Sequence, residues 1–178
     1  HTLYAESHLG KAEKLIEEGN YKNALNHIKK SRQYPSNLND IWPARKVESR
    51  PYYLEALVYE AMGNEKRAKK IWMKVIEGNS RLGSESEYYR ALALSKTGKK
   101  NKSEAVLNGL IEENFRFLKE TKDADKLALA NYLIGKAYEA LNQKVKADKY
   151  LTKAYNLKSD IIVDARIEAT YIPKPELN

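Results

Sequence analysis

The feature that most constrains the fold of this 178-residue chain is a 14-residue sequence motif that occurs twice. Residues 59–72 read YEAMGNEKRAKKIW, and residues 138–151, which begin 79 positions later, read YEALNQKVKADKYL. The two stretches share a Tyr, a Glu and two Ala, and Met62 of the first corresponds to Leu141 of the second. Self-similarity of this kind indicates a repeat architecture, in which each repeat is one supersecondary unit.

Each copy predicts a helix, a tight turn and a second helix. The turn residue is Gly or Asn, because these residues tolerate the left-handed backbone conformation that closes a helix. A small residue follows the turn residue by five positions in three copies, as Gly19 and Ala24, Gly63 and Ala68, Asn142 and Ala147. In the remaining copy Gly98 and Ala105 are seven positions apart, which predicts a two-residue insertion in that turn.

Another small residue lies seven positions before each turn residue, on the first helix of each pair. These residues are Ala12, Ala56, Ala91 and Gly135. Small side chains on both helices allow two antiparallel helices to approach closely, with large apolar residues such as Tyr59, Tyr138 and Trp72 at the flanks. The chain has only 5 Pro and 8 Gly, and strand-type alternation is scarce, so we predict an all-α fold.

Several residues predict where helices begin and where the chain leaves them. Asn20 and Asn64 directly follow the turn glycines and are expected to cap the next helix. The sequence SESE at 84–87 has the form of a capping box and predicts a helix start. Residues 34–49 contain two Pro and are expected to form a connection, whereas 103–120 read as one over-long second helix.

The pattern resembles the tetratricopeptide repeat family, whose 34-residue unit has small residues at its eighth and twentieth places. The best copy is 128–159, although Asn131 stands where the family usually has Trp and Ser159 where it has Pro. The resemblance implies one domain over residues 1–178 that forms an α–α superhelix of about four helical hairpins. The expected hairpins span about 3–33, 49–80, 84–120 and 124–158, with a capping helix at 160–170.

A narrower resemblance concerns the stretch YPSNLNDIW followed by PYYLEALVYEAMGNEKRAKKIWMKVI. It is similar to the C-terminal repeat region of large bacterial multidomain proteins, in which β-sandwich domains of carbohydrate-processing type precede helical repeats. The chain opens at His1 without a leader, so we interpret it as a processed protein or a piece of a longer one. This resemblance implies an alternative function as an accessory module of a carbohydrate-processing enzyme.

The resemblance to tetratricopeptide repeats also implies a binding face. Stacked hairpins present a concave surface lined by first helices, and in this family peptide contacts come from the second, fifth, ninth and twelfth places. Three Tyr share the fifth place, and Tyr suits interface anchoring because it combines a rigid ring with a hydroxyl. Alternatively, these Tyr pack between adjacent first helices. The predicted contact residues are Arg50, Tyr53, Leu57, Glu60, Tyr88, Leu92, Tyr132, Lys136 and Glu139.

No catalytic residue, cofactor or metal site is expected. The chain has no Cys, and its three His all lie within the first 27 residues, where we expect His8 to be packed and His27 to be exposed. There is no P-loop and no dinucleotide-binding glycine motif. The residues with which co-chaperone members of the family grip a C-terminal carboxylate do not occur at the matching places, so a chaperone-tail receptor is not expected.

The formal net charge of +8, from 32 Lys and Arg against 24 Asp and Glu, favours acidic partners or nucleic acid. Both signs are interspersed, and Lys commonly fills solvated helix faces. We therefore expect a non-catalytic scaffold that binds a protein, a peptide or another domain of its parent chain, with a nucleic-acid-binding helical repeat as the alternative. No apolar run is long enough to span a bilayer, so a soluble protein is expected, with the cytoplasm favoured.

Overall fold

The computed structural model describes residues 2–33 and 49–157, and all regular secondary structure within these ranges is α-helical. The helices are α1 Thr2–Glu17, α2 Tyr21–Ser31, α3 Ser49–Ala61, α4 Glu65–Glu77, α5 Glu85–Lys96, α6 Lys100–Glu120, α7 Ala124–Ala140 and α8 Lys144–Asn156. The predicted all-α fold is confirmed. The capping helix expected at 160–170 lies outside the described residues, and so does the connection expected at 34–49, apart from Ser49.

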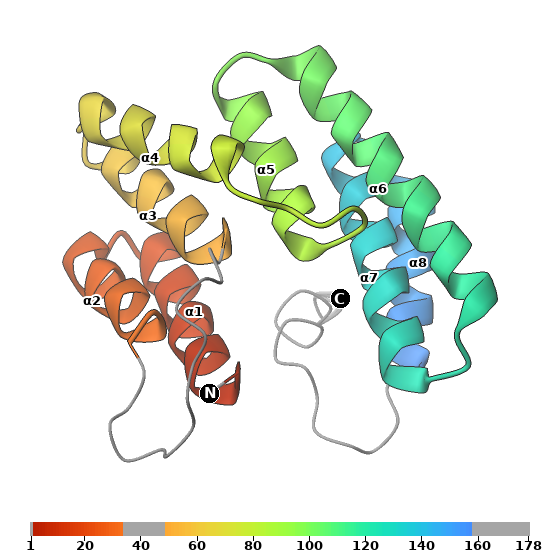
Figure 1. Cartoon of the computed structure of the whole chain (residues 1–178). Coiled ribbons are helices and arrows are strands. Elements are labelled where there is room, and N and C mark those ends of the chain that lie inside the picture. Colours follow the sequence, from red (N-terminus) through yellow and green to blue (C-terminus); the bar gives the residue numbers. More distant parts are fainter. Residues whose placement is uncertain (1, 34–48, 158–178) are drawn as a thin grey trace, which may run out of the picture.

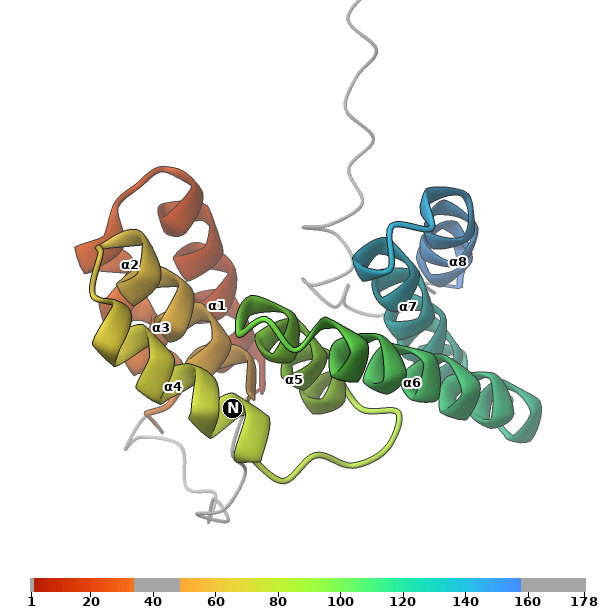
Figure 2. The ribbon, with the colours of Figure 1, turned by 90° about the horizontal axis from the view of Figure 1, so that it is seen from above.

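The helices pair in chain order into four hairpins, α1 with α2, α3 with α4, α5 with α6 and α7 with α8. Successive hairpins stack because each first helix packs against both helices of the preceding hairpin: α3 contacts α1 and α2, α5 contacts α3 and α4, and α7 contacts α5 and α6. Figure 1 shows the stack curving into an arch, and Figure 2 shows α1–α4 at one end and α6–α8 at the other, with α5 between them. The predicted α–α superhelix is therefore confirmed.

The turns between paired helices lie where the sequence predicts them. Positive φ angles occur at all four expected turn residues, Gly19, Gly63, Gly98 and Asn142. The Asn64 side chain accepts a hydrogen bond from the Arg67 backbone N–H at 3.2 Å, as a helix cap does. The Asn20 side chain forms no capping bond, so that part of the prediction was wrong.

The predicted close contacts between paired helices hold in three hairpins and need a correction in the third. Ala105 is exposed, whereas Ser103, five positions after Gly98, is only 4% exposed. The Ser103 hydroxyl donates a hydrogen bond to the carbonyl oxygen of Ala91 at 2.7 Å. The predicted two-residue insertion was therefore wrong, because a Ser whose hydroxyl bonds to the partner helix fits the small space that Ala fills elsewhere.

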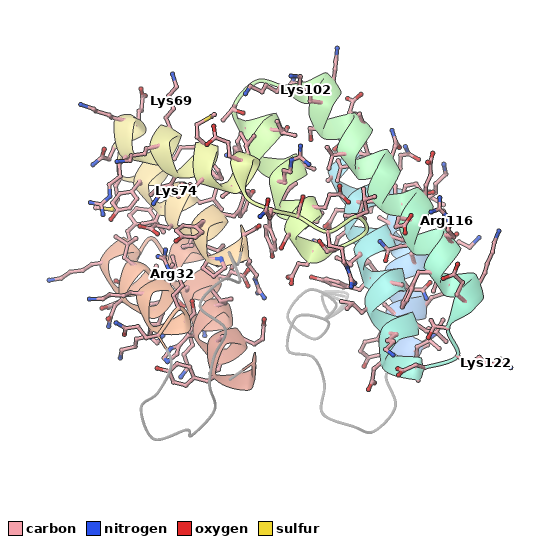
Figure 3. All side chains as sticks on the ribbon, in the orientation of Figure 1. Arg32, Lys69, Lys74, Lys102, Arg116 and Lys122 are labelled. Atoms are coloured by element: carbon pink, nitrogen blue, oxygen red, sulfur yellow. The ribbon has the colours of Figure 1, made fainter. Side chains whose placement is uncertain are left out.

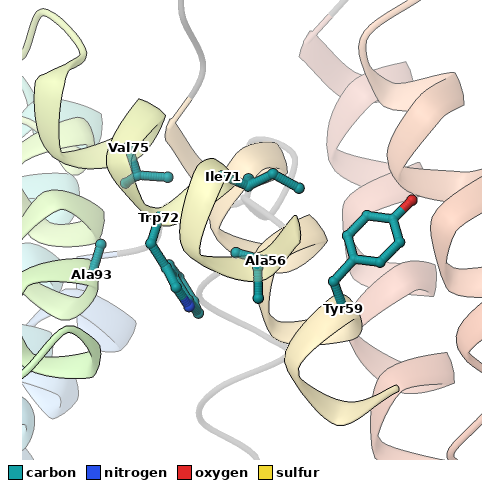
Figure 4. Packing of buried hydrophobic residues seen from close by; sticks show 7 residues of the cluster. Ala56, Tyr59, Ile71, Trp72, Val75 and Ala93 are labelled. Atoms are coloured by element: carbon teal, nitrogen blue, oxygen red, sulfur yellow. The ribbon is translucent and has the colours of Figure 1, made fainter. Parts of the chain in front are cut away.

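The core lies between successive hairpins as well as within them. Figure 4 shows one cluster, in which Trp72 of α4 lies between α3 and α5. The labelled residues of this cluster are Ala56, Tyr59, Ile71, Trp72, Val75 and Ala93. Burial of each large apolar side chain contributes about 1.5–3 kcal/mol, so the stacking of repeats is held mainly by apolar packing.

The third hairpin is the irregular one. Its second helix, α6, has 21 residues, whereas its first helix, α5, has 12. Helix α5 begins after Ser84 as the SESE sequence predicts, but the reciprocal capping box does not form. Instead, the Glu87 carboxylate accepts a hydrogen bond from the Gly83 N–H at 2.8 Å, and the Ser84 side chain forms no capping bond.

Candidate binding face on the first helices

The nine predicted contact residues all lie on three successive first helices. Four come from α3, two from α5 and three from α7, and these helices contact one another in order. We name this surface the first-helix face, and it comprises Arg50, Tyr53, Leu57, Glu60, Tyr88, Leu92, Tyr132, Lys136 and Glu139. The repeat spacing in the sequence therefore brings these residues onto one layer of the molecule.

Aromatic rings form the centre of this layer. The Tyr53 ring centroid lies 5.2 Å from that of Tyr89 and 5.2 Å from that of Trp72. The Tyr88 and Tyr89 centroids are 5.3 Å apart, in an edge-to-face arrangement that aromatic pairs favour. Tyr89 was missed from the sequence because it does not stand at the second, fifth, ninth or twelfth place of its repeat; its adjacency to Tyr88 was the available signal.

The three predicted tyrosines differ in how accessible they are. Tyr88 is only 9% exposed and belongs to the core between α5, α6 and α7, whereas Tyr53 and Tyr132 are half-buried. Burial raises the pKa of Tyr53 to about 12, and it also raises the pKa values of Tyr88 and Tyr89 well above the ordinary value of a phenol. The phenols are therefore neutral at physiological pH and offer apolar rings and hydroxyls rather than charge.

Arg50 is held inside the molecule by two carboxylates of α1. Its guanidinium pairs with Glu6 at 2.6 Å and with Glu13 at 2.8 Å, and the residue is 8% exposed. Burial acts to lower the pKa of Arg50, but Tyr89 and the two carboxylates outweigh this effect and hold the pKa above its usual value. Arg50 therefore joins α1 to α3, and it is not exposed to a partner as the sequence analysis expected.

The remaining predicted residues are at least partly open to solvent. Leu57 and Leu92 are half-buried, and exposed Glu60 pairs with Lys96 of the next first helix at 3.1 Å. Lys136 and Glu139 form an ion pair within α7. The accessible part of the first-helix face therefore consists of Tyr53, Leu57, Glu60, Leu92, Tyr132, Lys136 and Glu139.

Basic residues are more frequent on the second helices of the hairpins than on the first helices. The first helices α1, α3, α5 and α7 carry 7 basic and 9 acidic residues, whereas the second helices α2, α4, α6 and α8 carry 16 basic and 7 acidic residues. In Figure 3 the labelled side chains of Lys69, Lys102 and Arg116 point away from the body of the arch. The positive charge of the described part therefore lies on the second helices and not on the first-helix face.

The two histidines of the first hairpin form a pair that the sequence analysis did not anticipate. His27 is half-buried rather than exposed, and its Nδ1 lies 2.8 Å from Nδ1 of His8. Across residues 2–33 and 49–157 no group of three or more His, Cys, Asp or Glu residues is arranged to hold a metal ion. In the same ranges no helix combines the length and apolarity that crossing a membrane requires.

Comparison with known proteins adds two kinds of similarity. Two solved structures are similar to the chain: MamA from residue 41 to its end, from Desulfovibrio magneticus RS-1, and the MamA RS-1 ArsTM double mutant. The first is 20% identical and covers 87% of this chain and 76% of that one; the second is 21% identical and covers 87% and 75%. Both TM-scores are 0.35, which is too low to support an argument from either structure. A search of curated proteins finds no match.

The family comparison bears directly on the hairpins. The tetratricopeptide repeat model matches residues 49–79 and residues 128–161. The first match contains α3 and α4, and the second contains most of α7 and all of α8. In both hairpins the small residues and the positive-φ turn residue lie where the repeat spacing requires them. The α3–α4 and α7–α8 hairpins of this chain are therefore tetratricopeptide repeats.

Proposed function

We propose that this chain is a non-catalytic scaffold that binds a segment of a protein or peptide along the first-helix face. Tetratricopeptide repeats typically serve protein–protein interaction, and two hairpins match that family. The observation that carries the proposal is the run of half-exposed Tyr53, Leu57, Leu92 and Tyr132 across three contacting first helices. Rigid aromatic and aliphatic side chains of this kind are the usual anchors of protein interfaces.

The chemistry of this face favours an extended segment with apolar side chains and mixed charge. The tyrosines are neutral, so they contribute ring area and hydroxyls to a partner backbone. Glu60 pairs with Lys96 in an exposed position, and Lys136 pairs with Glu139. Exposed ion pairs contribute little to stability, roughly 0–1 kcal/mol, so a partner can exchange them for its own charges at small cost.

Site-specific crosslinking in the full chain tests this proposal. A photoreactive residue is placed at Leu57 or Lys136 on the first-helix face, and at Lys69 or Lys102 on second helices as matched controls. We expect one protein to be captured from the first two positions and not from the control positions. That protein, once purified, should bind Lys136→Glu and Leu57→Ser about tenfold more weakly than the unmodified chain, with Lys69→Glu unchanged.

A crosslink that forms only from Lys69 or Lys102 would overturn the proposal. So would a partner whose affinity does not change with Leu57→Ser and Lys136→Glu while Lys69→Glu weakens it. Circular dichroism on each variant checks that a lost crosslink does not reflect a lost fold.

Binding of nucleic acid is the second candidate, and it has its own observation. The basic residues concentrate on second helices, with 12 basic against 3 acidic residues on α2, α4 and α8. Binding by such lysines weakens steeply as salt rises, so titration of a generic duplex at low and high salt tests it. Failure to bind the duplex even at low salt would remove this candidate. The hypothesis of an accessory module of a carbohydrate-processing enzyme stays a prediction.

A further inference from the structure

A pocket of about 550 Å³ lies apart from the first-helix face. Its walls are residues 81–85, which lead into α5, the C-terminal half of α6, and the N-terminal half of α7. Figure 1 shows the chain between α4 and α5 reaching toward α7 before it turns into α5. None of the nine predicted contact residues lines this pocket, which we name the loop pocket.

The loop pocket exists because α6 is much longer than α5, and its loop wall is fixed by a clamp on Gly83. The Asn114 side chain donates hydrogen bonds to the carbonyl oxygens of Gly83 and Leu110, both at 2.9 Å. The Glu87 carboxylate accepts from the Gly83 N–H at 2.8 Å. Gly83 has φ +74°, and a Cβ there would lie 2.9 Å from Cγ of Glu113. A wall held in this way is preorganised, which lowers the entropic cost of binding.

Exposed apolar side chains gather at this pocket. Leu82 is 67% exposed, and Phe117 and Leu129 are each 37% exposed. They make up half of the six exposed large apolar residues in the part of the chain that the structure describes. Ala130 and Leu133 add buried apolar surface beneath them. A patch of this kind marks an interaction site on a water-exposed surface.

The polar groups of the pocket favour a partner that brings an acceptor and a negative charge. The Ser84 hydroxyl oxygen is buried and has no hydrogen-bond partner among the described residues. Glu113 pairs with Arg116 at 2.8 Å, Lys126 pairs with Asp123 at 3.6 Å, and Glu85 has an interaction within the chain. Arg81 also lines the pocket and forms no ion pair with any residue of 2–33 or 49–157. Its positive charge is therefore available to pair with a carboxylate of a partner.

We propose that the loop pocket binds a large apolar side chain of a partner protein that stands next to an acidic residue. The apolar side chain packs among Leu82, Phe117 and Leu129, and the neighbouring carboxylate pairs with Arg81. The Ser84 hydroxyl donates a hydrogen bond to a backbone carbonyl of the partner. A volume of about 550 Å³ suits one or two side chains, and the net charge of +8 attracts an acidic partner. This proposal does not depend on binding at the first-helix face.

Methyl NMR titration of the full chain with three synthetic peptides tests the proposal. The probes are Gly-Asp-Phe-Asp-Gly, Gly-Lys-Phe-Lys-Gly and Gly-Asp-Ser-Asp-Gly. We expect the first peptide to shift the methyl resonances of Leu82, Leu129 and Leu133, the second to bind about tenfold more weakly, and the third to cause no shift. Equal shifts from all three peptides, or none from the first, would overturn the proposal.

Matched variants assign the binding to individual side chains. Leu82→Ser and Arg81→Glu should each weaken the first peptide by about tenfold. Val145→Ser alters an 85% exposed apolar residue on α8, and Lys102→Glu alters an exposed cation at the start of α6, so both should leave the affinity unchanged. Equal losses from the control variants would show non-specific attraction and contradict the proposal.

The alternative occupant to test is the chain's own segment 160–164, which reads DIIVD and combines apolar and acidic side chains. The free full-length variant Ile162→Ser separates the two cases. We expect the Leu82 and Leu129 methyl resonances to be unchanged in this variant. If they move, the terminal segment of the chain is the occupant and the proposal of a partner protein is overturned.

Discussion

The α3–α4 and α5–α6 hairpins both bring two antiparallel helices into close contact, but they do so with different residues. The first pairs two helices of 13 residues, whereas the second pairs 12 residues with 21. Close contact is made by Ala56 and Ala68 in the first hairpin, and by Ala91 and Ser103 in the second. The tetratricopeptide repeat model matches only the first of the two. Close approach of the helices therefore depends on the size and hydrogen bonding of the contact residue, and not on alanine itself.

The irregular hairpin also creates surface that the regular one lacks. Helix α6 continues beyond the start of α5, and the clamped loop at Gly83 covers part of the extra length. The loop pocket lies at this mismatch in length. A departure from the regular repeat therefore coincides with the loop pocket, while other hairpins lie on either side of it.

The largest expected effect comes from enlarging the contact residue of each hairpin. Ser103→Leu should lower the free energy of unfolding by about 3 kcal/mol, because it overfills the contact and removes the hydrogen bond to Ala91. Ala68→Leu should cost about 2–3 kcal/mol through overfilling alone. Urea denaturation followed by circular dichroism measures both changes.

Ala105→Leu is the matched control for the third hairpin, because Ala105 is exposed and lies on the same helix as Ser103. It should change stability by no more than about 0.5 kcal/mol. A larger loss from Ala105→Leu than from Ser103→Leu would show that the third turn does contain the insertion, and the comparison between the hairpins would fail.

A comparison of Gly83 in the clamped loop with Gly63 in an ordinary repeat turn tests how rigid the clamp is. Gly63 and Gly83 have nearly equal φ angles, +73° and +74°, but a Cβ at Gly63 meets nothing within 4 Å. Gly63→Ala should cost about 1 kcal/mol from the left-handed backbone alone, and Gly83→Ala about 2 kcal/mol because Glu113 must also move. Thermal unfolding measures the loss of stability in each variant. Equal losses would mean that the Glu113 side chain moves away from residue 83 without an energetic cost.

Acidification should act on the first hairpin and leave the third one largely unaffected. Burial lowers the pKa of His8 and the pKa of His27, and the positive charges of nearby Lys11 and Lys30 lower both pKa values further. The charge of His27 also lowers the pKa of His8. A group whose folded pKa lies below its unfolded value of about 6.5 contributes stability above that pH and loses it as the pH falls. A small decrease in melting temperature from pH 7.5 to pH 5.5 is therefore expected.

Hydrogen exchange assigns this acid effect to a part of the chain. Amide protection of α1 and α2 should fall at pH 5.5, after correction for the intrinsic exchange rate, while α5 and α6, which contain no His, keep theirs. His27→Asn should reduce the pH dependence. Equal loss of protection in both hairpins would indicate a global charge effect instead of the His8–His27 pair.

The turn residues were predictable because their constraint is local. A left-handed backbone favours Gly or Asn whatever surrounds it, so Gly19, Gly63, Gly98 and Asn142 were identified without any contact information. The unusual length of α6 was likewise predictable from an uninterrupted helical pattern, although α6 begins at Lys100 and not at Ser103. Ser103 was missed because its role depends on the carbonyl of Ala91, which lies twelve positions away on another helix.

The candidate binding face was predictable only in outline. Repeat spacing places Tyr53, Tyr88 and Tyr132 on successive first helices, but it does not say how deeply each one packs. Tyr88 is buried because α6 and α7 enclose it, and Arg50 is buried because Glu6 and Glu13 of α1 reach it. Burial of this kind depends on neighbours from other hairpins, which no single repeat specifies.

By itself, the order of residues determined the helical class, the positions of the turns and the pairing of helices, because backbone conformation and small-residue spacing are local properties. Tertiary structure alone decided which predicted contacts remain accessible, that His8 meets His27, and that a pocket opens beside α6. These features arise where separate helices meet. Their geometry depends on distances between segments that the linear pattern does not encode.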